Sequence, residues 1–189
     1  MKESILYKIL RPVLTFIFKV IYRPTIIGKE NISTTGRIIL AGTHTHILDC
    51  ILLMCCTKRP IHFLAKAELM KGPKKIIFAN MGLIPVHRER KDPNSLIEAR
   101  KYLNNDMVIG IFPEGTTRKK KNTLLPFKIG AVKLASDTNS MIVPFTINHE
   151  YIPFKKSVEI IFDKPISIKN DLEKENELLK SIIEKNMEG

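Results

Sequence analysis

The stretch that decides the fold is RIILAGTHTHILDCILLMCC, which runs from Arg37 to Cys56. It begins with a short apolar run of the kind found in buried strands, and Gly42 and Thr43 end that run. The segment from His46 to Cys56 is predicted to be a helix. A buried strand, a polar turn and a helix in succession are typical of an α/β fold.

The rest of the chain continues this alternation of strands and helices. Further strands are predicted at residues 61–66, 83–86, 107–112, 140–147 and 156–168, the last with a turn at 163–165. Further helices are predicted at residues 71–82, 94–105, 128–138 and 170–187, and residues 22–36 are predicted to be a loop. We therefore expect a single α/β domain over residues 25–189, with a mixed, partly parallel sheet flanked by helices.

The composition fits a globular domain with a strong positive charge. Of the 189 residues, 44% are hydrophobic and 26% are charged, and the formal net charge is +12. This excess favours anionic partners, such as nucleic acid, an anionic membrane surface or phosphorylated substrates. The chain has no Trp and only 7% aromatic residues, which weakens the case for stacking on nucleic-acid bases. We expect no nucleic-acid partner. The alternative hypothesis, a nucleic-acid-binding module, predicts binding to oligonucleotides that weakens steeply as the salt concentration rises.

The three cysteines, Cys50, Cys55 and Cys56, lie together in an apolar run. Their spacing fits neither a zinc site nor a disulfide framework. We expect buried, reduced thiols, as in a cytosolic protein, with no part in the chemistry.

Residues 1–24 are predicted to be an amphipathic helical segment that associates with a membrane. Lys8, Arg11 and Lys19 interrupt its apolar residues, so no uncharged run approaches the ~20 residues of a membrane-spanning helix. On a helical wheel these three cations share one face, opposite the apolar residues. Such a helix suits a membrane interface, and packing on the protein's own core is an equal alternative. Pro12 is expected to kink or divide this helix.

Polar clusters follow three of the predicted strands at their carboxyl ends. These clusters are GTHTHILD at residues 42–49, HRER at 87–90 and PEGTTRKKK at 113–121. In open α/β sheets, binding sites gather at the carboxyl ends of strands. We therefore expect the three clusters to meet in space.

The first cluster has the residue types of a general base and the carboxylate that orients it. His46 and Asp49 are three residues apart, so a helix places them on one face, which slightly favours His46 as the base. His44 and Asp49 are five apart and meet only if His44 precedes the helix and turns back towards its first turn. In an alternative interpretation, His44, His46 and Asp49 are the metal ligands of a metal-dependent hydrolase.

The other two clusters contain groups that suit a phosphate. Arg88 presents a planar fork that matches phosphate oxygens. The hydroxyl and backbone N–H groups that follow Gly115 can donate to an anion. Glu114 lies among many cations and is a candidate to orient an arginine or a substrate hydroxyl.

At these residues the sequence resembles the glycerolipid acyltransferase family. The resemblance extends from Ile27 to Phe145 and rests on four blocks in the family's order. The blocks are His-x4-Asp at His44 and Asp49, Gly-x-Ile-x-x-x-Arg at Gly82, Ile84 and Arg88, Phe-Pro-Glu-Gly-Thr at residues 112–116, and a Val-Pro step at Val143 and Pro144. This chain departs from the family pattern at Thr43, His46 and Pro85, and an extra Thr117 moves the arginine of the third block to Arg118.

The resemblance implies an enzyme that moves an acyl group from a thioester to the free hydroxyl of 1-acylglycerol 3-phosphate, giving phosphatidate. Glycerol 3-phosphate and other lysophospholipids are alternative acceptors, and the donor is a thioester of coenzyme A or of acyl carrier protein. The implied catalytic residues are His44 and Asp49, and the implied substrate-binding residues are Arg88, Glu114, Gly115, Thr116 and Arg118. No metal and no other cofactor is expected. The enzyme is expected at the cytoplasmic face of a membrane, as a peripheral or monotopic protein.

Overall fold

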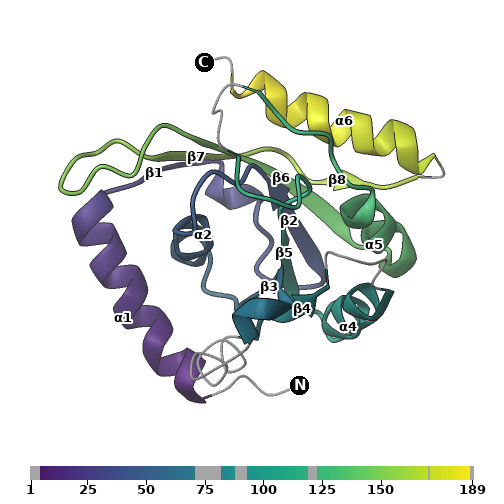
Figure 1. Cartoon of the computed structure of the whole chain (residues 1–189), viewed down its shortest axis with the longest axis horizontal. Helices are drawn as coiled ribbons and strands as arrows, with labels where there is room; N and C mark the ends of the chain where they lie inside the picture. Colours follow the sequence, from purple (N-terminus) through teal and green to yellow (C-terminus); the bar gives the residue numbers. More distant parts are fainter. Residues whose placement is uncertain (1–4, 71–81, 88–92, 119–122, 170, 188–189) are drawn as a thin grey trace.

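The structure is a computed structural model that describes residues 5–70, 82–87, 93–118, 123–169 and 171–187 (Figure 1). Among these residues, the strands of the central sheet are β1 (Thr25–Ile27), β2 (Ile38–Gly42), β3 (Ile61–Lys66), β4 (Ile84–Val86), β5 (Val108–Ile111), β6 (Met141–Asn148), β7 (Glu159–Phe162) and β8 (Ile166–Ser167). They follow the order β1-β7-β6-β2-β5-β3-β4, with β8 beside β6. β6 is antiparallel to β7 and β8, whereas the other pairs are parallel, so the predicted mixed sheet is confirmed.

Helices cover both faces of this sheet, as predicted. They are α1 (Ile5–Tyr22), α2 (Asp49–Cys56), α4 (Pro93–Asn104), α5 (Gly130–Thr138) and α6 (Leu172–Lys185), with the short 3-10 helices η1 (Lys29–Asn31) and η2 (Ala67–Met70). Side chains of the central strand β2 alternate between two cores, because successive residues of a strand point to opposite faces. Leu40 packs in the core under α1 and α2, whereas Ile39 and Ala41 pack in the core under α4, α5 and α6 (Figure 1).

Two predicted elements differ from the structure. The predicted loop over residues 22–36 contains β1, which pairs with the distant β7; a three-residue strand leaves no periodic pattern in the sequence. The helix predicted from His46 begins at Asp49, because the Asp49 side chain accepts hydrogen bonds from the amides of the preceding turn. The helix predicted over residues 71–82 lies outside the described residues, apart from Gly82.

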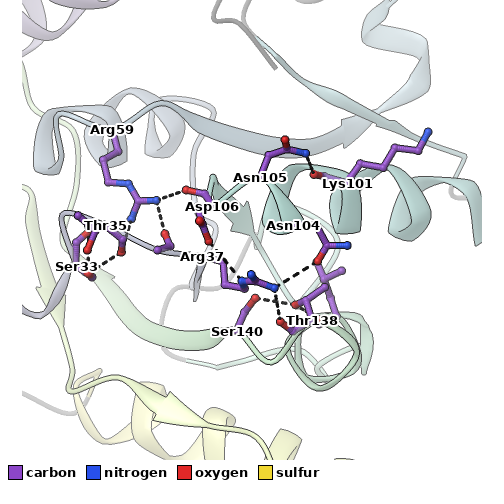
Figure 2. A network of polar contacts seen from close by, with 12 residues as sticks. Ser33, Thr35, Arg37, Arg59, Lys101, Asn104, Asn105, Asp106, Thr138 and Ser140 are labelled. Atoms are coloured by element: carbon purple, nitrogen blue, oxygen red, sulfur yellow. Dashed lines mark hydrogen bonds and ion pairs between the residues drawn. The ribbon is translucent and has the colours of Figure 1, made fainter.

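Two arginines link the amino ends of the central strands (Figure 2). Arg59, just before β3, donates to the carbonyl oxygens of Ser33 at 3.0 Å and Asp106 at 2.6 Å. Arg37, just before β2, donates to the carbonyl oxygen of Thr138 at 3.2 Å and forms an ion pair with Asp106 at 3.5 Å. Because this network ties together the segments that precede β2, β3, β5 and β6, it fixes the strand ends opposite those that carry the polar clusters.

The helix α1 packs on the core with one face and exposes apolar side chains on another. Tyr7 and Phe18 are buried in the core that α2 shares. Arg11 strengthens this packing, since its guanidinium donates to three carbonyl oxygens at and after the end of α2, including that of Lys58 at 2.7 Å. Pro12 lies inside α1 and does not divide it, contrary to one of the two predicted effects.

The outward stripe of α1 is formed by Ile5, Ile9, Val13, Phe16, Ile17 and Val20. Phe16 is 69% exposed, which is unusual for so large an apolar side chain. The core-packing interpretation is thus confirmed for one face of α1, whereas membrane association of the exposed face stays a prediction. Within the described part of the chain, no helix combines the length and the apolar character that crossing a bilayer requires.

Candidate active site

His44 and Asp49 face each other at the carboxyl end of β2. His44 Nδ1 lies 2.9 Å from Asp49 Oδ2. The contact forms because the chain turns after β2, so that His44 precedes α2 and Asp49 is the first residue of that helix. His46, which helical spacing favoured, contacts the Asp49 carboxylate through its backbone N–H, at 2.9 Å.

The Asp49 carboxylate is fully buried and surrounded by donors. Oδ2 accepts from the amides of Thr45 at 2.7 Å and His46 at 2.9 Å, in addition to the His44 ring. Oδ1 accepts from the hydroxyl of Tyr151 at 2.5 Å. A buried carboxylate with this set of partners is held in one orientation.

The His44 ring is positioned by Phe112 as well as by Asp49. The two rings are stacked, with centroids 4.0 Å apart and an interplanar angle of 19°. Because Nδ1–H donates to the carboxylate, Nε2 keeps the lone pair that can accept a proton. The His44 side chain is 16% exposed, so it is partly open to the solvent. Phe112 directly follows β5, the neighbour of β2, so the first and third polar clusters meet as predicted.

Tyr151 is the candidate functional residue that sequence reasoning missed. Its ring packs edge-on against Phe18 and Tyr22 of α1, with centroids 6.0 and 5.7 Å away. Burial raises the pKa of Tyr151 above its usual range, and the negative charge of Asp49 raises it further, so the phenol stays a donor. No motif spacing points to a partner 102 positions from Asp49; the sequence offers only an aromatic residue after a predicted strand.

Glu114 and Arg118 are buried beneath the His44 backbone. The guanidinium Nε of Arg118 lies 3.4 Å from Glu114 Oε1, and the two side chains are 2% and 0% exposed. The Arg118 amide donates to the carbonyl oxygen of His44 at 2.8 Å, and Glu114 Oε2 accepts from the Leu125 amide at 3.0 Å. Burial raises the pKa of Glu114, against which the Leu125 amide and Arg118 act. These contacts show that both residues hold the loop in place, and their predicted role in substrate binding stays a prediction.

Thr116 and Thr117 are the exposed part of the same turn. Gly115 has a φ of +68°, which lets the chain reverse there, and its amide donates to the carbonyl oxygen of Phe112. Among the residues that the structure describes, the amides of Thr116 and Thr117 have no intramolecular acceptor. Two backbone donors and two hydroxyls therefore remain available for an anion beside His44.

The second polar cluster is placed only in part. It follows β4 at the edge of the sheet, separated from β5 by β3. Arg88 lies outside the described residues, so its predicted place in the site stays a prediction.

The metal-ligand alternative finds no support in the geometry of the first cluster. His44 directs Nδ1 to Asp49, and His46 Nδ1 accepts from the Leu48 amide at 3.2 Å. Over the described ranges, no three His, Cys, Asp or Glu side chains are grouped so that they hold a metal ion. The arrangement is that of an oriented general base.

The three cysteines are buried or half-buried, although Cys50 directly follows Asp49. All three are free thiols; Cys55 and Cys56 are buried, as predicted, and Cys50 is half-buried. Burial raises the pKa of Cys50 to about 12 and that of Cys55 to about 11. Very little reactive thiolate is present at neutral pH with such values.

Comparisons with known proteins establish the family. The sequence model of the Acyltransferase family matches residues 23–148, and the chain belongs to this family. A 1-acyl-sn-glycerol-3-phosphate acyltransferase from Borreliella burgdorferi is 33% identical over 75% of this chain and 56% of its own length. The enzyme of the same name from Bacillus subtilis is 32% identical over 62% of this chain and 58% of its own. The chain thus spans about half the length of the curated relatives it matches.

A solved structure confirms the fold. The 1-acyl-sn-glycerophosphate acyltransferase PlsC from Thermotoga maritima superposes with a TM-score of 0.78 and 21% sequence identity. The match covers 96% of this chain and 80% of that protein. Nearly the whole chain therefore has the same α/β architecture as this solved structure.

The first prediction concerns Tyr151. Tyr151→Phe keeps the ring and removes one hydrogen bond to Asp49. Turnover should fall roughly ten- to hundredfold with little change in the Michaelis constants, because a bond to a charged group contributes roughly 1.5–3 kcal/mol. Tyr22→Phe is the matched control, since its ring belongs to the same aromatic cluster. Equal turnover in Tyr151→Phe and the wild type would show that Asp49 does not need this donor.

The second prediction concerns Arg118. Arg118→Ala leaves Glu114 buried without its cation, so the free energy of unfolding should fall by about 3 kcal/mol in urea denaturation. The double variant Glu114→Gln, Arg118→Met should recover most of that loss, because no buried charge remains. A normal stability of Arg118→Ala together with a raised Michaelis constant for a phosphorylated acceptor would instead make Arg118 a substrate ligand.

Proposed function

We propose that this protein is an O-acyltransferase that moves a fatty acyl group from a thioester to the free hydroxyl of 1-acylglycerol 3-phosphate, making phosphatidate in phospholipid biosynthesis. The observation that carries the proposal is the His44–Asp49 pair, in which the carboxylate holds Nδ1 and leaves Nε2 free. The names of the relatives from Borreliella burgdorferi and Bacillus subtilis support this acceptor. Glycerol 3-phosphate and other lysophospholipids are the alternative acceptors for the same chemistry.

In the proposed mechanism, His44 Nε2 removes the proton of the acceptor hydroxyl while the oxygen attacks the thioester carbonyl carbon. The carbon–sulfur bond then breaks, and the leaving thiolate takes the proton from the imidazolium. Asp49 stabilises the imidazolium and keeps the ring in one tautomer throughout. The acyl group passes directly to the acceptor, so neither a cysteine nor a metal ion takes part.

The turn after β5 is proposed to bind the anionic groups of the substrates. The free amides and hydroxyls of Thr116 and Thr117 lie on the surface beside His44. The amide of Arg118, the next residue of the turn, donates to the carbonyl oxygen of His44. They suit the acceptor phosphate, with Arg88 as its expected second ligand, and the oxyanion that forms on the thioester carbon. Glu114 and Arg118 contribute indirectly, by fixing the His44 backbone.

We propose that the enzyme acts at a membrane and is attached to its cytoplasmic face as a peripheral or monotopic protein. Both the acceptor and the product are lipids, and the apolar stripe of α1 is available to enter a bilayer interface. The aromatic contacts of Tyr151 join that helix to the Asp49 carboxylate. The donor is a thioester of coenzyme A or of acyl carrier protein, and the net charge of +12 suits both of these anionic carriers.

The third prediction separates the two histidines of the first cluster. His44→Ala should lower turnover by roughly 10²–10⁴, the range for losing a general base. His46→Ser should keep most of the activity, because His46 contacts Asp49 through its backbone. The measurement is an acyltransfer assay that pairs both thioester donors with lysophosphatidate, glycerol 3-phosphate and other lysolipids.

The reverse ranking, with an active His44→Ala and an inactive His46→Ser, would contradict this assignment. Activity that a chelator abolishes and a divalent ion restores would favour the metal-dependent hydrolase instead. A wild-type protein that transfers acyl groups to none of these acceptors would exclude the proposed reaction.

The fourth prediction tests membrane attachment. Serine in place of Ile9, Val13 and Phe16 should weaken binding to lipid vesicles about a hundredfold, if each side chain contributes roughly 1 kcal/mol by partial burial in the bilayer. The protein should stay folded, because all three are exposed. Ile97→Ser with Leu178→Ser, at exposed apolar positions of α4 and α6, is the matched control. Undiminished vesicle binding by the triple variant would place the attachment elsewhere.

A further inference from the structure

An open groove of about 430 Å³ lies between α1 and the carboxyl end of α2. Its lining includes Lys8, Arg11 and Lys19 from α1. Lys29 and Lys58 also line it, and they come from outside that helix. None of the described residues that line the groove is acidic, so one concave surface gathers cationic groups from three separate segments.

The lysines of this groove are available to a ligand, whereas its arginine is not. Lys8, Lys19, Lys29 and Lys58 are exposed, and across the described residues none of them forms an ion pair. Arg11 is part of the wall, because its guanidinium donates to carbonyl oxygens at and after the end of α2. The mobile, strongly hydrated lysine ammonium groups therefore set the charge of the groove.

The charges of the groove also affect the pKa of the Cys55 thiol, which lies on the groove lining. Burial raises its pKa to about 11, and the charges of Lys19 and Arg11 act in the opposite direction. A cluster of like charges on a concave surface raises the local concentration of anions. The groove is thus suited to a phosphate.

The apolar stripe of α1 runs beside the groove. Lys8 is followed by the exposed Ile9, and Lys19 is followed by the exposed Val20. Since adjacent residues of a helix are about 100° apart around its axis, the cationic and apolar rows occupy neighbouring faces of α1, rather than the opposite faces predicted from the sequence. A ligand that satisfies both rows carries an anionic group attached to hydrocarbon.

We propose that this groove binds the phosphate of an anionic phospholipid whose acyl chains lie along the apolar stripe of α1. The inference deepens the proposed membrane attachment and does not depend on the chemistry at His44. The groove is towards the opposite end of α2 from Asp49: Met54 and Cys55 on its lining come five and six residues later, about 8–9 Å along the helix axis. A lipid held there therefore orients the protein on the bilayer and leaves the His44–Asp49 pair free for substrate.

The test removes the two groove lysines that do not belong to α1. In Lys29→Gln with Lys58→Gln, the dissociation constant for phosphatidylcholine vesicles doped with phosphatidylglycerol should rise roughly thirtyfold, because each lysine near an anionic bilayer contributes about 1 kcal/mol and 1.4 kcal/mol is a tenfold change. Binding to pure phosphatidylcholine should not change. Lys164→Gln with Lys169→Gln removes the same charge beside β8, far from α1 in Figure 1, and should bind like the wild type.

Wild-type affinity of the Lys29, Lys58 variant for the anionic vesicles would overturn the proposal. An equal loss in the Lys164, Lys169 control would overturn it too, because bulk charge would then govern binding. A titration with coenzyme A separates the source of the phosphate: if only coenzyme A binding weakens in the groove variant, the groove holds a donor and not a lipid. Failure of the proposed reaction would appear separately, as absent acyltransfer by the wild type on detergent-dispersed acceptor.

Discussion

The buried carboxylate of Asp49 is the constraint on which the rest of the site depends. A carboxylate removed from water is stable only when hydrogen-bond donors surround it. Here the donors come from the turn after β2, from the His44 ring and from Tyr151. This one requirement accounts for the late start of α2, for the orientation of the His44 ring and for the attachment of the segment after β6. The parallel pairing of β2 with β5 then brings Phe112 and its turn to the same place.

The same carboxylate joins the chemistry to the surface that we propose meets the membrane. Tyr151 contacts Asp49 with its hydroxyl and α1 with its ring, so the helix and the His44–Asp49 pair are parts of one packed unit. Tyr7 and Phe18 hold one face of α1 in the core while the apolar stripe faces outward. In the enzyme that we propose, whose acceptor and product are lipids, such packing would fix the distance of the base from the bilayer.

The sequence predicts those parts of the structure that local pattern determines. Apolar runs locate β2, β3 and β5, and His-x4-Asp identifies His44 and Asp49, although helical spacing alone favours His46. Long-range contacts leave no such pattern: β1 depends on its pairing with β7, and Tyr151 depends on the path of the chain after β6. The spacing of the third block also does not reveal that Thr117 is exposed and that Arg118 pairs with the buried Glu114.

The most direct test of the central claim is nitrogen-15 NMR of the His44 imidazole in the full chain, assigned with His44→Gln and recorded at a pH where the ring is neutral. The account predicts the tautomer with the proton on Nδ1 and the lone pair on Nε2, because Asp49 accepts from Nδ1. Asp49→Asn should abolish that preference, as the oriented carboxylate is lost. A neutral His44 with its proton on Nε2, or a tautomer that is unchanged in Asp49→Asn, would contradict the assignment of His44 as the base.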